Sequence, residues 1–268
     1  MASSASSRPL ILLTNDDGID APGLLVLQET LSAFAEVAVV APEHNWSASG
    51  HSRTMHKPLR VRATRLANGA EALESSGSPS DCVALALLGV LKGTPDLVVA
   101  GINLGANVAQ DVTYSGTVAA AMEGVLMGLS AIAVSLDTYD VGDYGPAARF
   151  AASLAQRLVQ AALPEPLLLN VNVPNLPEGE IRGVQITRLG RRLYRNALVE
   201  RTDPRGRTYY WIGGEPPDGI PEEGTDIGAL AHGYISVTPL LLDLTDHAKL
   251  PLLASWNLNY PAVKAQGG

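Results

Sequence analysis

Hydrophobic residues gather in five short runs along the chain, each rich in Val, Ile and Leu without strict alternation with polar residues. The runs cover residues 9–14, 36–41, 96–100, 131–136 and 166–172. Strands of this kind are typical of a sheet that is buried on both faces, because neither face then needs polar side chains. The runs therefore predict the central strands of a parallel sheet.

The segments between these runs place apolar side chains three or four positions apart, which is the spacing of an amphipathic helix. The helical stretches run from Leu24 to Phe34, Val83 to Leu91, Val118 to Val125 and Phe150 to Leu158. Because strand and helix alternate, the sequence predicts an α/β fold with a doubly wound, mostly parallel, Rossmann-like sheet. We expect a single α/β domain over residues 9–268, preceded by a short disordered leader, residues 1–8.

The pattern changes after Pro174, where Pro, Gly and Arg become frequent. Two short β-type runs, 184–187 and 208–212, interrupt the alternation of strand and helix. A loose insertion would leave the consecutive aromatic residues Tyr209 to Trp211 in water, which is unfavourable for such large side chains. We therefore expect residues 185–235 to form a projecting β-hairpin arm that packs on another subunit.

The composition is that of a folded protein that does not bind nucleic acid in general. Of 268 residues, 46% are hydrophobic, and the formal net charge of −8 at pH 7 opposes a stable complex with nucleic acid. Cys82 is the single cysteine, so we expect it to be a packing residue without an internal disulfide. The first apolar run is too short for a signal peptide or a membrane span. These features predict a cytoplasmic protein that does not bind membranes.

Polar residues with oxygen ligands follow three of the predicted strands. The adjacent carboxylates of Asp16 and Asp17 come directly after the first run, a loop rich in Ser and Asn spans residues 42–52, and Gly101 to Asn107 follow the third run. Parallel strands place their carboxyl ends at one edge of the sheet, so these groups are expected to meet there. Such oxygens suit a hard divalent cation. An ordinary turn or a helix cap is the alternative explanation for the acidic pair.

Six motifs occur in order along the chain, and they are TNDDGIDAPG (14–23), VVAPEHNWSASGHS (39–52), GSPSDCV (77–83), AGINLGANVAQDVTYSGTVAAAMEG (100–124), NVNVP (170–174) and GTDIGALAHGYISVTPL (224–240). Together they resemble the SurE family, the survival-protein-E nucleotidases, from about Leu10 to Leu240. The ordered set is far more specific than any one motif.

The resemblance implies one divalent ion per subunit, Mg²⁺ or Mn²⁺, held by Asp16, Asp17, Ser47 and Asn103. Zinc is disfavoured, because none of these four positions is His or Cys. Asp16, Asp17 and Asn103 are also the candidate catalytic residues. The resemblance further implies hydrolysis of nucleoside 5′- and 3′-monophosphates, and of short polyphosphate, by a homodimer or tetramer that exchanges the hairpin arm.

Candidate phosphate contacts precede the predicted helix that begins near Val118. Backbone N–H groups at a helix N-terminus bind anions, so we expect Ser115, Gly116 and Thr117 to contact the phosphate together with Asn107. Plain helix capping is the alternative for Ser115 and Thr117. Asn15 either donates to a phosphate oxygen or only fixes the turn beside the acidic pair.

Two further residues have open roles. His51 is a candidate general acid for the departing ribose oxygen, or it only orients its loop by hydrogen bonding. Trp46, beside Ser47, either stacks on the nucleobase or packs as an ordinary hydrophobic residue. The sequence lacks the G-x-S-x-G pattern of a nucleophile-elbow hydrolase. A metal-dependent nucleotide sensor without turnover and a broad small-molecule phosphatase remain the alternative functions.

Overall fold

The computed structural model of the chain describes residues 8–193, 196–214 and 218–259. Its main sheet contains Leu10–Thr14 (β1), Glu36–Pro42 (β2), Val61–Arg65 (β3), Glu71–Ser75 (β4), Leu97–Leu104 (β5), Ala131–Asp137 (β6), Leu168–Pro174 (β7), Val184–Ile186 (β8) and Ile235–Leu240 (β13). Among the described residues, the order of these strands is β3-β4-β2-β1-β5-β6-β7-β13-β8. The neighbours β2, β1, β5, β6 and β7 are parallel, as the apolar runs predicted.

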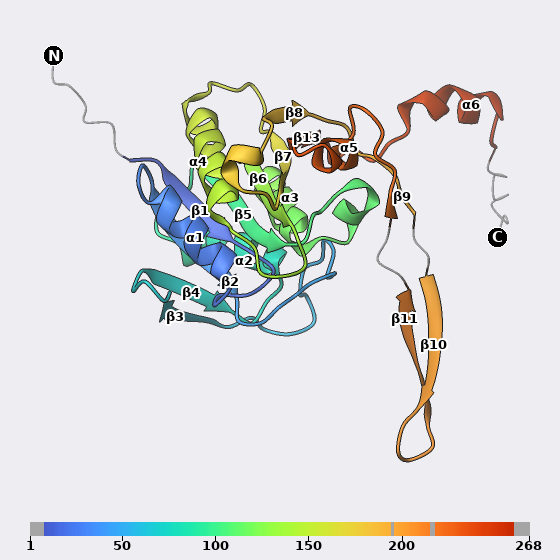
Figure 1. The fold of residues 1–268 in the computed structure, drawn as a ribbon, viewed down its shortest axis with the longest axis horizontal. Coiled ribbons are helices and arrows are strands. Elements are labelled where there is room, and N and C mark those ends of the chain that lie inside the picture. Colours follow the sequence, from blue (N-terminus) through green and yellow to red (C-terminus); the bar gives the residue numbers. More distant parts are fainter. Residues whose placement is uncertain (1–7, 194–195, 215–217, 260–268) are drawn as a thin grey trace, which may run out of the picture.

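Helices cover both faces of this sheet (Figure 1). The helices Pro22–Leu31 (α1) and Gly145–Gln160 (α4) pack on one face, and Pro79–Leu85 (α2) and Gly116–Leu126 (α3) pack on the other. Ile11 and Leu13 belong to the core under α1 and α4, whereas Leu12 belongs to the core under α2 and α3. Successive side chains of a strand point to opposite faces, so a doubly covered strand is apolar throughout. The doubly wound α/β fold is confirmed.

The edges of the sheet contain strands that the apolar pattern did not predict. β3 has the sequence VRATR and is mostly exposed, so it lacks an apolar run. β13 pairs antiparallel with β7, which closes the parallel series on that side. The helix expected from Val83 to Leu91 is shorter in the structure, because α-helical geometry ends at Leu85. A π-helical turn, Ala86–Val90, follows, and Gly89 in this turn has a φ of +129°. That conformation favours glycine and ends the helix.

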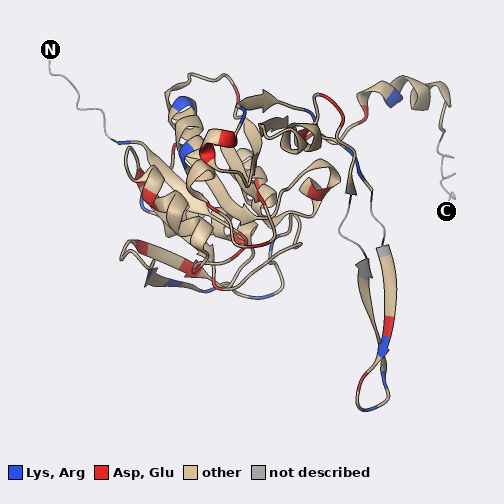
Figure 2. Ribbon diagram, viewed as in Figure 1, with Lys and Arg blue, Asp and Glu red and all other residues tan. Residues whose placement is uncertain are grey.

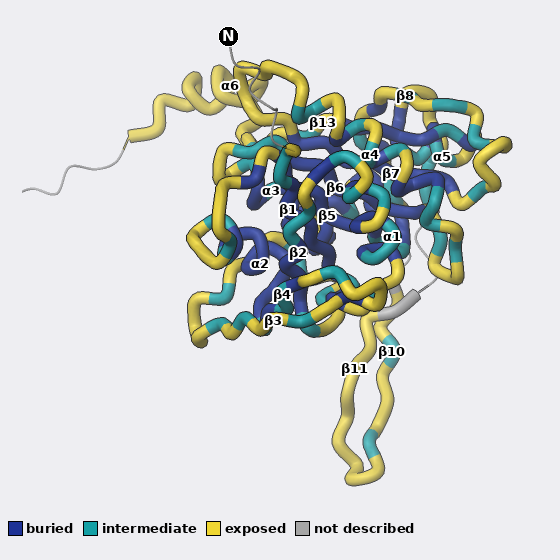
Figure 3. Tube along the Cα trace, turned by 90° about the vertical axis from the view of Figure 1, so that its left-hand side faces the viewer, coloured by how far each residue is buried: buried dark blue, intermediate teal, exposed yellow. Residues whose placement is uncertain are grey.

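A β-hairpin projects from the body of the molecule (Figure 1). It consists of Asn196–Thr202 (β10) and Thr208–Gly214 (β11), which pair antiparallel in register from Asn196–Gly214 to Thr202–Thr208. Two further short strands, Arg192–Leu193 (β9) and Asp218–Gly219 (β12), pair where the hairpin joins the body. We refer to residues 196–214 as the hairpin arm. Figure 3 shows it as mostly exposed, in contrast to the buried sheet.

The arm is narrower than the expected range of 185–235. β8 pairs with β13 in the main sheet, and the helix Asp226–Ala231 (α5) packs on β13. Both segments therefore belong to the body, because their hydrophobic and hydrogen-bonding groups are used there. Residues 1–7 of the expected leader lie outside the described residues, and Arg8 donates to Ala35 O at 2.9 Å.

Two further observations bear on the sequence-based expectations. None of the helices in the described part of the chain, including the last, Leu250–Ser255 (α6), is long and apolar enough to cross a membrane. Cys82 is fully buried among the residues under α2 and α3, as expected of a packing residue. Burial raises the pKa of its thiol to about 12.

Candidate metal and phosphate site

The predicted site residues meet at the carboxyl ends of β2, β1 and β5, which are neighbours in the sheet. A cavity of about 390 Å³ lies at this edge. It is lined by residues at the carboxyl end of β5, by residues that follow β1, β2, β5 and β6 and by the segment before α3. These are Asp16, Ser47, Ala48, Asn103, Leu104, Gly105, Ala106, Asn107, Asp111, Tyr114, Ser115 and Tyr139. We call this cavity the site cavity. Crevices at this edge are where open α/β sheets bind ligands.

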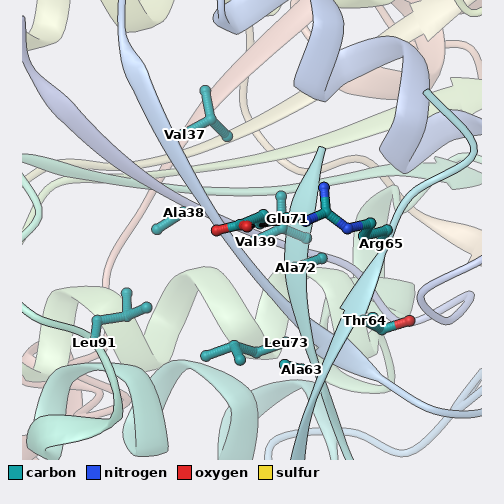
Figure 4. Close-up of a pocket in the computed structure, with 10 residues that line it drawn as sticks. All are labelled: Val37, Ala38, Val39, Ala63, Thr64, Arg65, Glu71, Ala72, Leu73 and Leu91. Carbon is teal, nitrogen blue, oxygen red and sulfur yellow. Dashed lines mark hydrogen bonds and ion pairs between the residues drawn. The ribbon is translucent and has the colours of Figure 1, made fainter. Parts of the chain in front are cut away.

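A larger cavity, of about 800 Å³, lies at the far edge of the sheet between β2, β3 and β4 (Figure 4). Its lining is mostly apolar, and Arg65 and Glu71 form an ion pair of 3.1 Å there. None of the residues that the sequence proposed for the site lines it. Volume alone therefore does not locate the chemistry of this molecule.

Asp16 is buried and fixed by several donors at the start of α3. The hydroxyl of Thr117 donates to Asp16 Oδ1, and the backbone N–H groups of Gly116 and Thr117 also hydrogen-bond to this carboxylate. Burial raises the pKa of Asp16 above its ordinary value, and these hydrogen bonds oppose the rise. The positive end of the helix α3 thus stabilises an anion, and that anion is the carboxylate of Asp16 itself.

Asp17 is partly exposed and lies beside Asp16. Its Oδ2 accepts from Leu104 N at 3.2 Å, and its Oδ1 accepts from Asn45 Nδ2 at 3.3 Å. Burial raises the pKa of Asp17 to about 6, and the charge of Asp16 adds to the rise. Two carboxylates in such proximity repel each other, and a bound cation would relieve that repulsion.

The turn after β1 is held by Asn15 and Gly18. Asn15 is fully buried, its Nδ2 donates to Gly18 O at 2.8 Å, and its Oδ1 accepts from Gly18 N at 3.3 Å. Gly18 has a φ of +102°, a conformation that L side chains rarely adopt. These contacts favour the turn-fixing role of Asn15, and its contact with phosphate stays a prediction.

Asn103 and Ser47 reach the site cavity from different strands. The register between β5 and β6 shifts between Ala100 and Asn103, and a Cβ on Gly101 would lie 2.4 Å from Val134 O, so only glycine fits at this irregularity. Asn103 Nδ2 donates to Gly105 O at 2.7 Å, which leaves the amide oxygen as its ligand atom. The exposed Ser47 lies in the loop after β2, where its backbone N–H donates to Asn45 Oδ1 at 2.7 Å.

The segment before α3 supplies the other predicted phosphate contacts. Ser115 caps α3, since its Oγ accepts from Val118 N at 3.0 Å, and it also lines the site cavity. Asn107 lines the cavity too, and its Nδ2 donates to Ser135 Oγ at 2.9 Å. The backbone donors of Gly116 and Thr117 bond to Asp16 in this structure. Contacts of all four residues with phosphate stay predictions.

The structure places His51 and Trp46 away from the lining of the site cavity. His51 Nε2 lies 3.1 Å from Oε2 of the buried Glu123 and lines a separate cavity with Arg53. This contact favours the loop-orienting role of His51. Trp46 is half-buried, and its backbone N–H donates to Asp16 O at 2.7 Å.

Three residues near the site escaped the sequence-based analysis. Ser49 Oγ is buried without a hydrogen-bond partner, and it lies 3.1 Å from the position that a Cβ on Gly116 would occupy. Tyr114 and Tyr139 line the site cavity. Tyr139 follows β6, a fourth parallel strand that ends at the same edge. Its position after a parallel strand therefore indicates a place at the site, as it does for Asp16.

The donors at this edge fit a hard divalent cation. They comprise two carboxylates, an amide oxygen and a serine hydroxyl, with an unpartnered buried hydroxyl beside Asp16. Within the described residues, no group of three or more His, Cys, Asp or Glu side chains is placed to hold a metal ion, so the donor set has only two acidic members. Oxygen ligands of this kind suit Mg²⁺ or Mn²⁺ better than zinc.

Fold and site together define a Rossmann-like α/β protein with a candidate carboxylate-based cation site at the carboxyl edge of its parallel strands. The model of the family described as "Survival protein SurE" matches residues 11–196, and the chain belongs to the SurE family. A curated relative from Herpetosiphon aurantiacus, named 5'-nucleotidase SurE, is 54% identical over 92% of this chain and 98% of its own length.

Other relatives agree with this assignment. A protein of the same name from Chloroflexus aggregans is 51% identical, over 92% of this chain and 98% of that protein. The crystal structure of the SurE protein from Aquifex aeolicus superposes with a TM-score of 0.79 at 39% identity, and the match covers 93% of this chain and 100% of that one. The resemblance seen in the sequence motifs is therefore confirmed.

Proposed function

We propose that this chain is a divalent-metal-dependent phosphomonoesterase, a 5'-nucleotidase that releases phosphate from nucleoside 5′-monophosphates. The proposal extends to 3′-monophosphates and short polyphosphate. One observation carries it: Asp16, Ser47 and Asn103, from three separate strand ends, line one cavity together with the helix cap Ser115. The name 5'-nucleotidase SurE of relatives that are 54% and 51% identical supports the same activity.

In this proposal, Asp16, Asp17, Ser47 and Asn103 hold one Mg²⁺ or Mn²⁺ ion. Such an ion, when bound, polarises the phosphoryl group and neutralises charge that develops on its oxygens. Thr117 keeps the Asp16 carboxylate in place through its hydroxyl. Fixed donors of this kind need no rearrangement during the reaction, which is the main source of catalysis in phosphoryl transfer.

The substrate phosphate would lie between the acidic pair and the start of α3. Ser115 and Asn107 line that part of the site cavity, and we propose that they contact phosphate oxygens together with Asn15 and the backbone of Gly116 and Thr117. Asp16 and Asp17 would orient the attacking water for in-line displacement of the nucleoside oxygen. The products are the nucleoside and inorganic phosphate.

Phosphate release tests this proposal directly. We expect purified protein to release phosphate from AMP and 3′-AMP with Mg²⁺ or Mn²⁺ and not with EDTA. Asp17→Asn is expected to lower the rate by at least about 100-fold, because it removes one fixed charge at the reacting group. Asp20→Asn, which alters an exposed carboxylate three positions away, is the matched control and should leave the rate unchanged.

A second readout does not depend on turnover. A ligand that binds only the folded state raises the melting temperature, so Mg²⁺ or Mn²⁺ should stabilise the wild type and the Asp20→Asn variant but not Asp17→Asn. Folded wild type that binds AMP without releasing phosphate would instead be a nucleotide sensor. Equal rates with AMP, sugar phosphates and para-nitrophenyl phosphate would identify a broad phosphatase.

We also propose that the protein is a homodimer or tetramer whose subunits exchange the hairpin arm. The support is the exposure of large apolar side chains on β11, where Trp211 is 64% and Ile212 is 84% exposed. Surfaces of this kind mark protein interfaces. The cytoplasmic location expected from the sequence stays a prediction.

A further inference from the structure

Tyr114 and Tyr139 are unusual among the residues of the site cavity because they are large, aromatic and exposed. Tyr114 lies directly before the helix cap Ser115 and is 62% exposed, and Tyr139 follows β6 and is 68% exposed. Amphipathic rings with such exposure commonly mark binding surfaces. Neither ring is among the residues proposed above to contact the phosphate.

The backbone around Tyr139 is shaped to accommodate its ring. A Cβ on Gly105 would lie 3.0 Å from Tyr139 Cε1 and 3.4 Å from Cδ1, so the ring packs directly over the bare Cα of this glycine. Gly105 also has a φ of +111°, which favours glycine at this position. The ring is therefore held beside the loop that carries Asn103.

Arg192 contacts Tyr139 directly and Asp111, whose backbone holds Tyr114. Its Nε lies 2.7 Å from Asp111 Oδ2, and its side chain also hydrogen-bonds Tyr139. Asp111 lines the site cavity, and its backbone oxygen accepts from Tyr114 N at 2.9 Å. This ion pair neutralises the carboxylate of Asp111, which would otherwise repel a nucleotide.

We propose that Tyr114 and Tyr139 form the subsite that binds the base of the nucleotide, with Arg192 as the residue that positions Tyr139. This inference rests on the proposed function and names the part of the cavity that selects nucleotides over other phosphate esters. Stacking on aromatic rings tolerates every base, because each base has a π-face. The cavity of about 390 Å³ lies within the usual size range of small-ligand sites.

The subsite replaces an expectation based on position in the sequence. Trp46 was the aromatic residue nearest to a predicted ligand, but it does not line the site cavity. Its backbone holds Asp16 instead, through the N–H that donates to Asp16 O. The two tyrosines come from segments that meet only in the folded molecule.

Comparison of AMP with ribose 5-phosphate tests the subsite, since the two differ by the base alone. For Tyr114→Ala and Tyr139→Ala, we expect kcat/KM with AMP to fall roughly 10-fold, because stacking on one ring contributes about that factor. The value with ribose 5-phosphate should change by less than about 2-fold, since it makes no stacking contact. Tyr139→Phe keeps the ring and should retain the preference for AMP. Trp256→Ala, which removes an exposed aromatic ring outside both the site cavity and the hairpin arm, is the control.

Titration calorimetry with adenosine gives a readout without phosphate chemistry. Adenosine should bind the wild type and Tyr139→Phe, and bind more weakly to both alanine variants. An unchanged ratio of AMP to ribose 5-phosphate in both alanine variants would overturn the subsite. A change in the molecular mass of these variants in light scattering would also overturn the subsite, because the tyrosines would then face another subunit.

Failure of the proposed function gives a different result. Wild type that releases phosphate from neither substrate would contradict the phosphatase and leave the calorimetry to decide the subsite. Weaker adenosine binding by the alanine variants would then support the subsite, and equal binding would refute it.

Discussion

Gly116 occupies the first helical position of α3 because no side chain fits there. A Cβ at this position would lie 2.8 Å from Asp16 Cβ, 2.9 Å from Asp16 Oδ2 and 3.1 Å from Ser49 Oγ. The carboxylate of Asp16 is buried and held by Thr117, so it has little room to move away. A single methyl group would therefore displace the central acidic ligand of the proposed metal site.

We expect Gly116→Ala to lower metal-dependent phosphate release by about 100-fold, since displacements of about 1 Å have effects of that size. The free energy of unfolding should fall by about 1–3 kcal/mol, as for other overpacked positions. Kinetics and urea denaturation measure the two effects. Gly179→Ala is the control, because a Cβ there has no atom within 4 Å and both quantities should stay near wild type. Wild-type kinetics in Gly116→Ala would refute the packing argument.

At the scale of single residues, the sequence predicted candidate oxygen ligands at positions that the strand ends bring together. Asp16 follows β1 and Asn103 lies near the carboxyl end of β5, so their position at one edge of the sheet follows from the fold class alone. Ser49 was not predicted, because its approach to Gly116 depends on how the loop after β2 crosses the sheet edge. No local pattern contains that information.

At the scale of elements, apolar runs predicted the centre of the sheet and not its edges. β5 and β6 are largely buried, and each begins with an uninterrupted apolar segment, residues 97–100 and 131–134. β3 is an edge strand with exposed Arg residues, and β4 beside it is only partly buried and carries Glu residues, so both lack that pattern. Edge strands commonly carry charge, which prevents pairing with other chains. Sequence patterns therefore identify the part of a sheet that helices cover.

The loop after β2, residues 43–57, is an element whose position depends on a buried charge. Glu123 on α3 is 2% exposed, and it binds Arg53 and His51 of this loop, the latter at 3.1 Å. The loop also carries Ser47 and Ser49. Glu123 therefore anchors the loop that carries these two hydroxyl groups, through its contacts with His51 and Arg53.

We expect Glu123→Gln to lower the free energy of unfolding by about 1–3 kcal/mol, because Arg53 loses a charged hydrogen-bond partner at a buried position. Tryptic cleavage after Arg53 should become faster, since the loop opens more often. The control is Glu178→Gln, which removes an exposed pair with Arg149 and should change stability by less than about 1 kcal/mol. Equal stability losses in both variants, without faster cleavage, would contradict the proposed role of Glu123.

At the scale of the whole molecule, the hairpin arm has an apolar surface that no other described part of the chain covers. Besides Trp211 and Ile212, Tyr210 is 56% and Leu198 is 69% exposed. Charged residues gather near the tip instead, as Figure 2 shows, and Asp203 accepts from Arg205 N and Arg207 N there. A two-stranded hairpin is marginally stable by itself in water, so contacts with a partner would stabilise it.

The base of the arm is anchored separately from its strands. The buried Asp226 accepts from Ala109 N at 2.8 Å and from Gly190 N at 2.7 Å. These hydrogen bonds tie the chain that precedes the hairpin arm to the segment beside the site cavity. In contrast, none of the residues of the hairpin arm, 196–214, lines the site cavity. Removal of the arm alone should therefore leave the fold of the body intact, whereas removal of all of 185–235 would also take away Asp226.

We predict that replacing residues 196–214 with a short Gly-Ser link converts the oligomer to a monomer. Light scattering of the wild type should give two or four times the chain mass of 28.0 kDa, and the deletion should give one shortened chain. Trp211→Ser should weaken assembly and leave the secondary structure seen by circular dichroism unchanged, because Trp211 is exposed on the subunit. A monomeric wild type, or a deletion that keeps the oligomeric mass, would show that the arm does not join subunits. The exposed aromatic residues of β11 would then require another partner, since an uncovered surface of this kind promotes aggregation.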